Sequence, residues 1–175
     1  MADLGYLVFA GCLMPQGDGA KKLSSAYTSD QLVVVGLDVT NQDSVNQCKI
    51  VVEQKLQSVR KRHKKGGLWA VVNNAGIMSL FEVEFGEMNL FEKQMHVNCL
   101  GLVRVTKALL PLIRMNNFGA GRVVNVASLA GRFTLPGFVA YSMSKAPVIT
   151  FCDGLRREMS KWNIDIVSIE PHLYR

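Results

Sequence analysis

The sequence predicts an α/β fold in which a parallel sheet is flanked by helices. Five short apolar runs of the kind that form buried strands are spread along the 175 residues. Helical segments separate them, and this alternation is typical of βαβ units and a parallel sheet. With no internal repeat or linker visible, we expect a single domain over residues 1–175. The predicted strands are Tyr6–Leu13, Leu32–Leu37, Leu68–Val72, Val123–Ala127 and Ile164–Ile169.

The first two connections are expected to be helices of unequal strength. Gly17–Tyr27 is a short and weakly helical segment. The stretch after Thr40 repeats apolar residues at helical spacing until it reaches the basic run Arg60–Lys65. Thr40 is suited to cap the start of this helix, with Asp43 at its third position.

Two longer helices are predicted further along the chain, at Leu90–Met115 and at about Tyr141–Trp162. Pro147 lies in the second of them, two residues after Lys145. Proline removes a helical hydrogen bond and crowds a carbonyl of the preceding turn. We therefore expect a kink that disturbs the aim of Lys145.

Much of the net charge of +6 is concentrated in the run Arg60–Lys65. Such a run is most often a solvated helix end, and this is the interpretation that we favour. Binding to an anionic membrane surface is a weaker alternative. We expect no nucleic-acid partner.

The cysteines and histidines indicate neither a disulfide nor a metal site. The cysteines lack a C-x-x-C spacing and lie in apolar segments, so we expect reduced thiols in the core and a reducing intracellular compartment. The histidines have no mutual spacing that suggests ligands, so we expect no metal. Neither a secretory signal nor a membrane span is recognisable. The residues concerned are Cys12, Cys48, Cys99, Cys152, His63, His96 and His172.

Reactive side chains gather between residues 121 and 145. The predicted strand Val123–Ala127 ends at Ser128, and a loop with glycine and proline leads to Tyr141 and Lys145. Residues four apart share a helix face, so the phenol and the ammonium should project together. A positive charge beside a phenol stabilises the phenolate. We therefore predict a proton-transfer site at the mouth of the sheet, with Tyr141 as the acid/base.

A series of short motifs, in order along nearly the whole chain, resembles the short-chain dehydrogenase/reductase family. Each motif is weak alone, but together they are specific. Within the family, Gly5–Met14, Gly67–Ile77 and Glu82–Phe85 look most like the hydroxybutyrate branch, followed by the retinol and hydroxysteroid branches. The motifs are Asp38-Val39, Asn73-Asn74-Ala75-Gly76, Asn98, Ser128, Tyr141-Ser142-Met143-Ser144-Lys145 and Pro171.

The resemblance implies a Rossmann-like doubly wound sheet and an oxidoreductase that moves hydride between NAD(P) and an alcohol or ketone. Tyr141 would exchange the proton of the alcohol, and Lys145 would also hold the nicotinamide ribose. Ser128 would bind the substrate oxygen, and Asn98 would position a water in a proton relay. Arg132 could meet a substrate carboxylate, although an exposed loop arginine is the simpler interpretation.

The cofactor contacts are implied in the same way. Asp38 would accept from the adenine amino group while Val39 packs on the ring. Cys12 stands near the place where many NAD enzymes carry an acidic residue, so the choice stays open, with NAD favoured. The implied cofactor residues are Asp38, Val39, Asn73, Asn74, Ala75, Gly76, Tyr141, Lys145 and Pro171.

Two parts of the family pattern are not found. The family's first strand and glycine-rich turn should precede Gly5, and Gly17–Gly19 lacks the third glycine of that turn. The family's last strand and substrate-covering helices would follow Arg175. The expected sheet is thus truncated at both ends, with unpaired edges on the strands Tyr6–Leu13 and Leu68–Val72. His172 also stands where the family usually has glycine, and it could obstruct the nicotinamide.

A second interpretation therefore remains open beside the enzyme. A truncated, catalytically silent chain would act only through protein association. The helices that contain Asn98 and Tyr141 resemble those through which family members form homodimers or homotetramers. By the same resemblance, the protein would be mitochondrial or associated with the endoplasmic reticulum.

Overall fold

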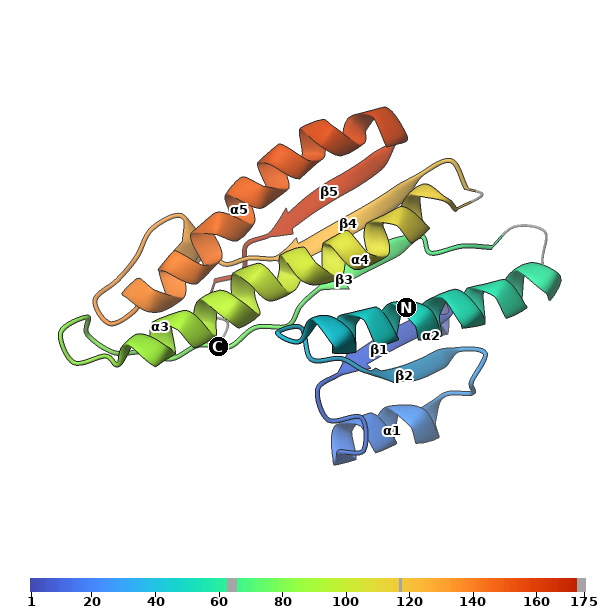
Figure 1. Cartoon of the computed structure of the whole chain (residues 1–175), viewed down its shortest axis with the longest axis horizontal. Coiled ribbons are helices and arrows are strands. Elements are labelled where there is room, and N and C mark those ends of the chain that lie inside the picture. The colour runs from blue at the N-terminus through green and yellow to red at the C-terminus, as the bar shows by residue number, and fades with distance from the viewer. Residues whose placement is uncertain (63–65, 117, 173–175) are drawn as a thin grey trace.

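The computed structural model describes residues 1–62, 66–116 and 118–172. Five parallel strands form two sheets, one of two strands and one of three. In the smaller sheet β1 pairs with β2, and in the larger sheet β4 lies between β3 and β5. Figure 1 shows both sheets in one view. The strands are β1 (Val8–Cys12), β2 (Leu32–Gly36), β3 (Ala70–Asn73), β4 (Gly121–Val126) and β5 (Ile164–Ile169).

The edges of β1 and β3 are the place where the two sheets fail to join. Neither strand pairs with the other. Residues of both strands line a cavity of about 1040 Å³, together with residues of α2 (Gln42–Arg62) and α4 (Leu102–Arg114). The predicted pair of unpaired apolar edges is therefore confirmed, and the sheet is interrupted in its middle.

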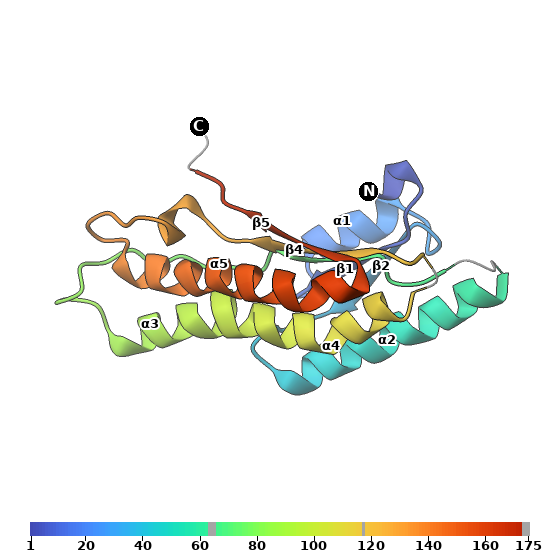
Figure 2. The same cartoon turned by 90° about the horizontal axis from the view of Figure 1, so that it is seen from above.

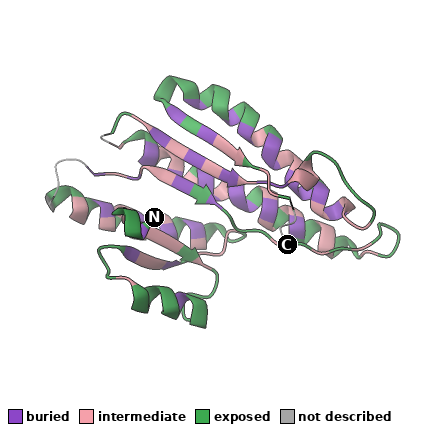
Figure 3. Cartoon of the chain, turned by 180° about the vertical axis from the view of Figure 1, so that it is seen from behind, coloured by how far each residue is buried: buried purple, intermediate pink, exposed green. Residues whose placement is uncertain are grey.

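Helices α2, α4 and α5 (Val139–Met159) lie on one side of the sheets (Figure 2). The shorter helix α1 (Asp18–Ala26) lies on the other side, where it packs on β2. Within the described residues, no helix covers the second face of the three-stranded sheet. Burial along β4 alternates as a result, with Gly121, Val123 and Asn125 turned to the helices and buried (Figure 3). The expectation of a buried strand at Val123–Ala127 is therefore met on one face of β4 only.

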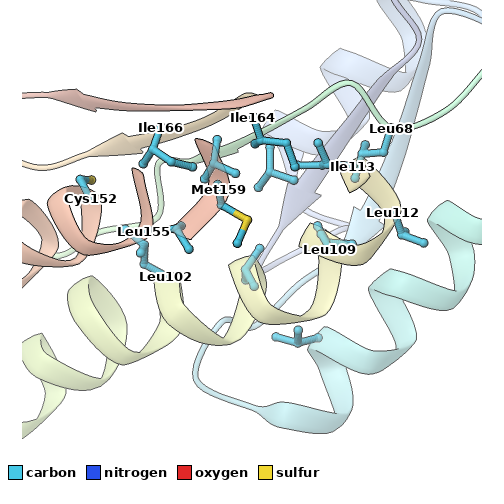
Figure 4. Packing of buried hydrophobic residues seen from close by; sticks show 14 of the residues in the cluster. Leu68, Leu102, Leu109, Leu112, Ile113, Cys152, Leu155, Met159, Ile164 and Ile166 are labelled. Carbon is cyan, nitrogen blue, oxygen red and sulfur yellow. The ribbon is translucent and has the colours of Figure 1, made fainter. Parts of the chain in front are cut away.

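The core lies between the three-stranded sheet and helices α4 and α5 (Figure 4). Val123 in the central strand is 0% exposed, and Ile113 of α4 and Cys152 of α5 are also fully buried. Gly121 allows this close packing, because a Cβ atom there would lie 2.2 Å from Cγ2 of Ile113. Burying an aliphatic side chain of this size contributes about 1.5–3 kcal/mol. The site-bearing sheet is therefore held mainly by these helix contacts.

The start of α2 differs from the prediction. Thr40 does not cap the helix, because its hydroxyl donates to Oδ1 of Asp38 at 2.7 Å. Asn41 takes that place, and its Oδ1 accepts from the backbone N–H of Ser44 at 3.0 Å. Asparagine and threonine are both good caps. The turn that Asp38 forms after β2 engages the hydroxyl of Thr40, so this hydroxyl does not cap α2.

The end of α2 carries the basic run. Residues 63–65, and with them His63, lie outside the described residues. Arg60 donates from Nε to the carbonyl of Gly66 at 2.9 Å and from Nη2 to that of Met115 at 3.3 Å. This arginine thus ties the helix end to neighbouring loops, as expected of a solvated helix terminus.

The predicted helix Leu90–Met115 is continuous but not uniform. It consists of α3 (Met88–Gln94), the π-helical segment η2 (Met95–Gly101) and α4. By length and composition alone, Met88–Arg114 could cross a membrane, although no span was expected from the sequence. Its buried side chains in α4 belong to the core, and this packing accounts for its apolar character.

Pro147 does not end α5, which runs through it as one helix (Figure 1). Lys145, two residues earlier, remains buried and reaches the end of β4. The helix is therefore not interrupted at Pro147, and Nζ of Lys145 lies 5.9 Å from the ring centroid of Tyr141.

Candidate functional site

A cavity of about 340 Å³ opens at the carboxyl ends of β4 and β5. Ser128, Tyr141 and Lys145 all line it, although two of them come from α5 and one follows β4. Parallel α/β folds commonly bind ligands at this edge of the sheet. The other lining residues are Asn74, Gly76, Ile77, Met78, Val126, Ala127, Leu129, Ala130, Phe133, Leu135, Phe138, Pro171 and His172.

Lys145 brings a charged group near the ring of Tyr141. Its Nζ atom lies 5.9 Å from the ring centroid of Tyr141 and donates to the carbonyl of Val126 at 2.8 Å. The side chain is nearly enclosed, since the residue is only 3% exposed. Burial lowers the pKa of Lys145 below its ordinary value, because desolvation disfavours the ammonium. The end of β4, which Ser128 follows in the chain, thus holds the ammonium of Lys145 in place.

Ser128 caps a short helix through its oxygen and keeps its O–H group for a further hydrogen bond. Its Oγ accepts from the backbone N–H of Ala130 at 3.1 Å and caps the short helix η3 (Leu129–Gly131). A serine hydroxyl has one donor and two acceptor sites. The cap uses an acceptor site, so the O–H can still donate to a ligand oxygen in the cavity.

Asn98 acts as a clamp on the loop after β3. Its Oδ1 accepts from the backbone N–H of Ile77 at 2.8 Å, and its Nδ2 donates to the carbonyl of the same residue at 2.8 Å. The same Nδ2 donates to Oγ of Ser144 at 2.8 Å. Asn98 lies in the π-helical segment η2 and is only 1% exposed. Its amide group is therefore engaged with protein partners at both ends.

Three residues that the sequence analysis gave no separate role complete this arrangement. Ser144 donates to the carbonyl of Tyr141 at 2.7 Å and so links the clamp to the first turn of α5. Gly131 permits close contact with α5, because a Cβ atom there would lie 3.0 Å from the carbonyl oxygen of Lys145. Gln94 is buried and accepts from the backbone N–H of Ser79 at 3.0 Å. Only Ser144 carried a signal, through its place between Tyr141 and Lys145.

Asn73 is the last residue of β3, and its side chain joins a buried network. Its Nδ2 donates to Oγ1 of Thr106 at 2.9 Å and to Oδ1 of Asn125 at 2.8 Å. Asn125 donates in turn to Sγ of Cys152 at 3.1 Å. The side chain of Asn73 therefore joins β3 to α4 and β4.

Asn74 and Gly76 face the smaller cavity. A Cβ atom on Gly76 would lie 3.4 Å from both Oδ1 of Asn98 and Nζ of Lys145. Glycine at this position therefore lets the loop approach both polar groups. Pro171 and His172 line the same cavity, and the carbonyl of Pro171 accepts from the backbone N–H of Leu129 at 3.1 Å.

Asp38, Val39 and Ala75 are separated from this group. Val39 and Ala75 line the larger cavity between the two sheets. Asp38 accepts from the hydroxyl and the backbone N–H of Thr40, which holds the pKa of its carboxyl below the ordinary value. Val39 packs against Gly101, where a Cβ atom would lie 2.6 Å from its Cγ2. The candidate cofactor residues are thus spread over two cavities, except Asp38, which lines neither of them.

The described residues contain no group of three or more His, Cys, Asp or Glu side chains that could hold a metal ion. All four cysteines are free thiols. Only Cys48 and Cys152 are buried, whereas Cys12 and Cys99 are partly exposed, contrary to the expectation that all would be core residues.

A parallel α/β fold with a hydroxyl, a phenol and an ammonium at the strand ends is typical of proteins that bind a ligand at the carboxyl edge of a sheet. The chain belongs to the short chain dehydrogenase family, which it matches over residues 1–175.

Relatives of this chain include two mammalian dehydrogenases. It is 40% identical over 169 residues to estradiol 17-beta-dehydrogenase 2 of Mus musculus, a match that covers 96% of this chain and 42% of that protein. It is 41% identical over 169 residues to mitochondrial D-beta-hydroxybutyrate dehydrogenase of Bos taurus, covering 95% of this chain and 46% of that protein. The chain thus spans less than half the length of these relatives.

A solved short-chain dehydrogenase from Streptomyces avermitilis has a similar structure. The TM-score is 0.80 at 28% identity, over 99% of this chain and 59% of that one. This likeness confirms the predicted α/β fold.

Proposed function

We propose that the 340 Å³ cavity binds the hydroxyl or carbonyl group of a substrate for an NAD(P)-dependent oxidoreductase. The observation that carries this proposal is the meeting of Ser128, Tyr141 and Lys145 in one cavity at the strand ends. Their chemistry is complementary. Ser128 can donate a hydrogen bond to the substrate oxygen, Tyr141 can exchange the proton of the alcohol, and Lys145 supplies positive charge. Asn98 belongs to the proposed catalytic set as the clamp that holds the neighbouring loop.

In the proposed reaction, the proton of the alcohol passes to the phenolate oxygen of Tyr141. The ammonium of Lys145, 5.9 Å from the ring centroid, stabilises the negative charge of that phenolate. Ser128 donates a hydrogen bond from its hydroxyl to the substrate oxygen and keeps that oxygen beside the phenol. These residues account for the proton transfer. Bound NAD(P) would supply the hydride acceptor or donor.

The described residues fit one end of that cofactor better than the other. Gly76 leaves room beside Lys145 and Asn74, where a nicotinamide ribose could approach without meeting a side chain. The pyrophosphate end has no comparable set of backbone donors. After β1, Gly17 leads into α1 with Asp18 in its first turn, and this carboxylate disfavours a phosphate at that helix start. No reaction step is therefore assigned to the cofactor.

The cofactor contacts of the remaining residues are part of the same proposal. Asp38 and Val39 would serve the adenine, and the loop Asn73 to Gly76 and Pro171 would line the rest. The location of Val39, Asn73, Asn74 and Ala75 around the larger cavity supports this assignment. NAD is favoured over NADP only by resemblance.

Turnover after loss of the phenol oxygen tests the proposal. Tyr141→Phe should lower the rate of NAD(P) reduction with an alcohol by at least about a hundredfold, the usual effect of losing a general acid or base. Tyr27→Phe is the matched control, because that hydroxyl donates to Asp3 at 3.3 Å on the exposed surface and should not affect turnover. Equal activity of Tyr141→Phe and the unchanged protein would refute the assignment.

A catalytically silent protein is the second candidate. The described residues offer no donor set for a pyrophosphate, and a cavity of about 1040 Å³ interrupts the sheet. Titration with NADH distinguishes the active enzyme from the silent protein, with the fluorescence of Trp69, which lines that cavity, as the signal. No binding at millimolar NADH would favour the silent form. Its association, like that of an active enzyme, would be as a homodimer or homotetramer through η2–α4 and α5, which ultracentrifugation can measure.

The remaining proposals concern the whole protein. Residues 1–175 would act as one domain, with a hydroxybutyrate-like or a retinol- or steroid-like alcohol as substrate. A mitochondrial or endoplasmic-reticulum location follows the resemblance, and the similarity to the mitochondrial dehydrogenase of Bos taurus supports the first. Fractionation of cells that express the protein tests this point.

A further inference from the structure

The lining of the 340 Å³ cavity is mostly apolar. Ser128, Tyr141 and Lys145 make up its polar end, Asn74 and His172 are two further polar residues, and aliphatic and aromatic side chains form most of the remaining surface. Among these, Phe133 and Leu135 are about half exposed, so they extend the apolar surface to the mouth. A ligand that reaches the polar end with a hydroxyl therefore has hydrocarbon around its other atoms.

Arg132, which does not line this cavity, is paired with a carboxylate. Arg132 donates from Nε to Oε2 of Glu170 at 2.7 Å and from Nη2 to Oε1 at 2.8 Å. The two residues flank the cavity, because Phe133 and Pro171, which follow them in the chain, both line it. Ser168 also donates to Oε1 of Glu170, at 3.0 Å. Both partners of this bidentate pair are therefore charged, and together they add no net charge to the mouth.

The charged state of the pair is stable near neutral pH. The hydrogen bond from Arg132 holds the pKa of Glu170 below its usual value, and the bond to Glu170 raises the pKa of Arg132. A substrate carboxylate would compete with Glu170 for the same guanidinium fork. If it succeeded, Glu170 would be left unpaired beside a second negative charge.

A carboxylate has little compensation elsewhere in the cavity. Transfer of an unpaired charge from water to an apolar site costs several kcal/mol. The ammonium of Lys145 already donates to the carbonyl of Val126 at 2.8 Å and lies at the polar end, beside the phenol. His172 is the other described residue of the lining that can carry a positive charge. Its contribution is therefore measured separately below.

We propose that this cavity selects an uncharged alcohol or ketone with an apolar body, and that Glu170 excludes carboxylate substrates by occupying Arg132. The inference rests on the proposed function, whose substrate class it narrows. Of the two kinds of substrate named above, it favours the retinol- or steroid-like alcohol over the hydroxybutyrate-like acid. Glu170 is a specificity-determining residue in this view, not a catalytic one.

The test compares two ligands that differ in one group, 3-methylcyclohexanol and 3-hydroxycyclohexanecarboxylate. Their dissociation constants are measured by ligand-observed NMR on the full chain, which requires no turnover. The neutral alcohol should bind at least about tenfold more tightly, a difference of about 1.4 kcal/mol. Glu170→Gln should strengthen binding of the acid by about fivefold to tenfold, by releasing a charge-assisted donor, and leave the neutral alcohol unchanged.

Asp165→Asn is the matched control. It removes the same charge from another arginine pair at the opposite end of β5, where Nη2 of Arg122 donates to Oδ2 of Asp165 at 2.7 Å. This variant should leave both affinities unchanged. Arg132→Gln in the Glu170→Gln background should abolish the gain, and Arg132→Gln alone should weaken neither ligand.

Specific results would overturn the proposal. These are equal binding of both ligands by the unchanged chain, no gain for the acid in Glu170→Gln, or loss of acid binding in Arg132→Gln alone. Acid binding that disappears in His172→Gln would also overturn it, by assigning the carboxylate to His172. Failure of the proposed function gives a different result. Turnover that depends on Tyr141 is then absent, whereas the ratio of the two dissociation constants is unchanged.

Discussion

The two-stranded and three-stranded sheets are built from similarly apolar strands, yet only the second is well buried. No residue of β1 is buried, whereas every other residue of β4 is. Both edges of β4 are paired, but β1 pairs on one side only and faces the 1040 Å³ cavity on the other. The burial of a strand therefore depends on its neighbours in the sheet as much as on its own sequence. The candidate site lies on the better-supported half.

The largest expected difference between the halves is in packing energy. Ile166→Ala in β5 should lower the free energy of unfolding by about 2–5 kcal/mol, because it leaves a cavity in the core. Val34→Ala in β2 should cost less than about 1 kcal/mol, since that side chain is only half-buried. Urea denaturation measures both values. Similar losses would mean that the two sheets are equally well packed.

Buried polar contacts should show the same contrast on a smaller scale. Asn125→Ala leaves Asn73 without one of its partners in the core, at a cost of about 1–3 kcal/mol. Asp38→Ala removes contacts to Thr40 in a partly exposed turn, and about 1 kcal/mol or less is expected. Thermal and urea denaturation of both variants check this order. A greater loss for Asp38→Ala would place the critical polar contacts in the smaller sheet.

Lys145 should contribute function without contributing stability. In Lys145→Met the cost of burying an ammonium disappears, while the carbonyl of Val126 loses one hydrogen bond. The net change in unfolding free energy should lie within about 1 kcal/mol, although activity is lost.

The pH dependence of stability sharpens this prediction. The pKa of Lys145 is lower in the folded state than in the unfolded chain, so unfolding takes up a proton between these two values. The lysine's contribution to stability therefore rises with pH across that window, which ends near the unperturbed pKa of about 10.4. Lys145→Met should lack this part of the rise. An unchanged pH profile would show that the ammonium is not desolvated.

The smallest effect is expected at the exposed pair of Arg132 and Glu170. The folded pKa of Glu170 is lowered, so its contribution is present above the unfolded value of about 4.3 and is lost as pH falls through the folded pKa. Because both side chains contact solvent, Glu170→Gln should barely change stability at neutral pH. Denaturation at pH 7 and in the acid range tests this. A marked loss at pH 7 would make the pair a structural rather than a specificity element.

Part of this protein could be deduced from local sequence rules alone. The order of strands and helices follows from periodicity, and the shared helix face of Tyr141 and Lys145 follows from their spacing. The position of Ser128 at a strand end could be predicted for the same reason, because each of these features depends on residues close together in the chain.

Other features depend on partners that are distant in sequence, and no local rule reveals them. The clamp of Asn98 on Ile77, the bonds from Asn73 to Thr106 and Asn125, and the pairing of Arg132 with Glu170 all arose this way. Local composition and spacing thus determined the elements and the candidate chemistry. Only tertiary structure decided which strand faces are buried and which polar groups remain available, since both are set by what packs beside them.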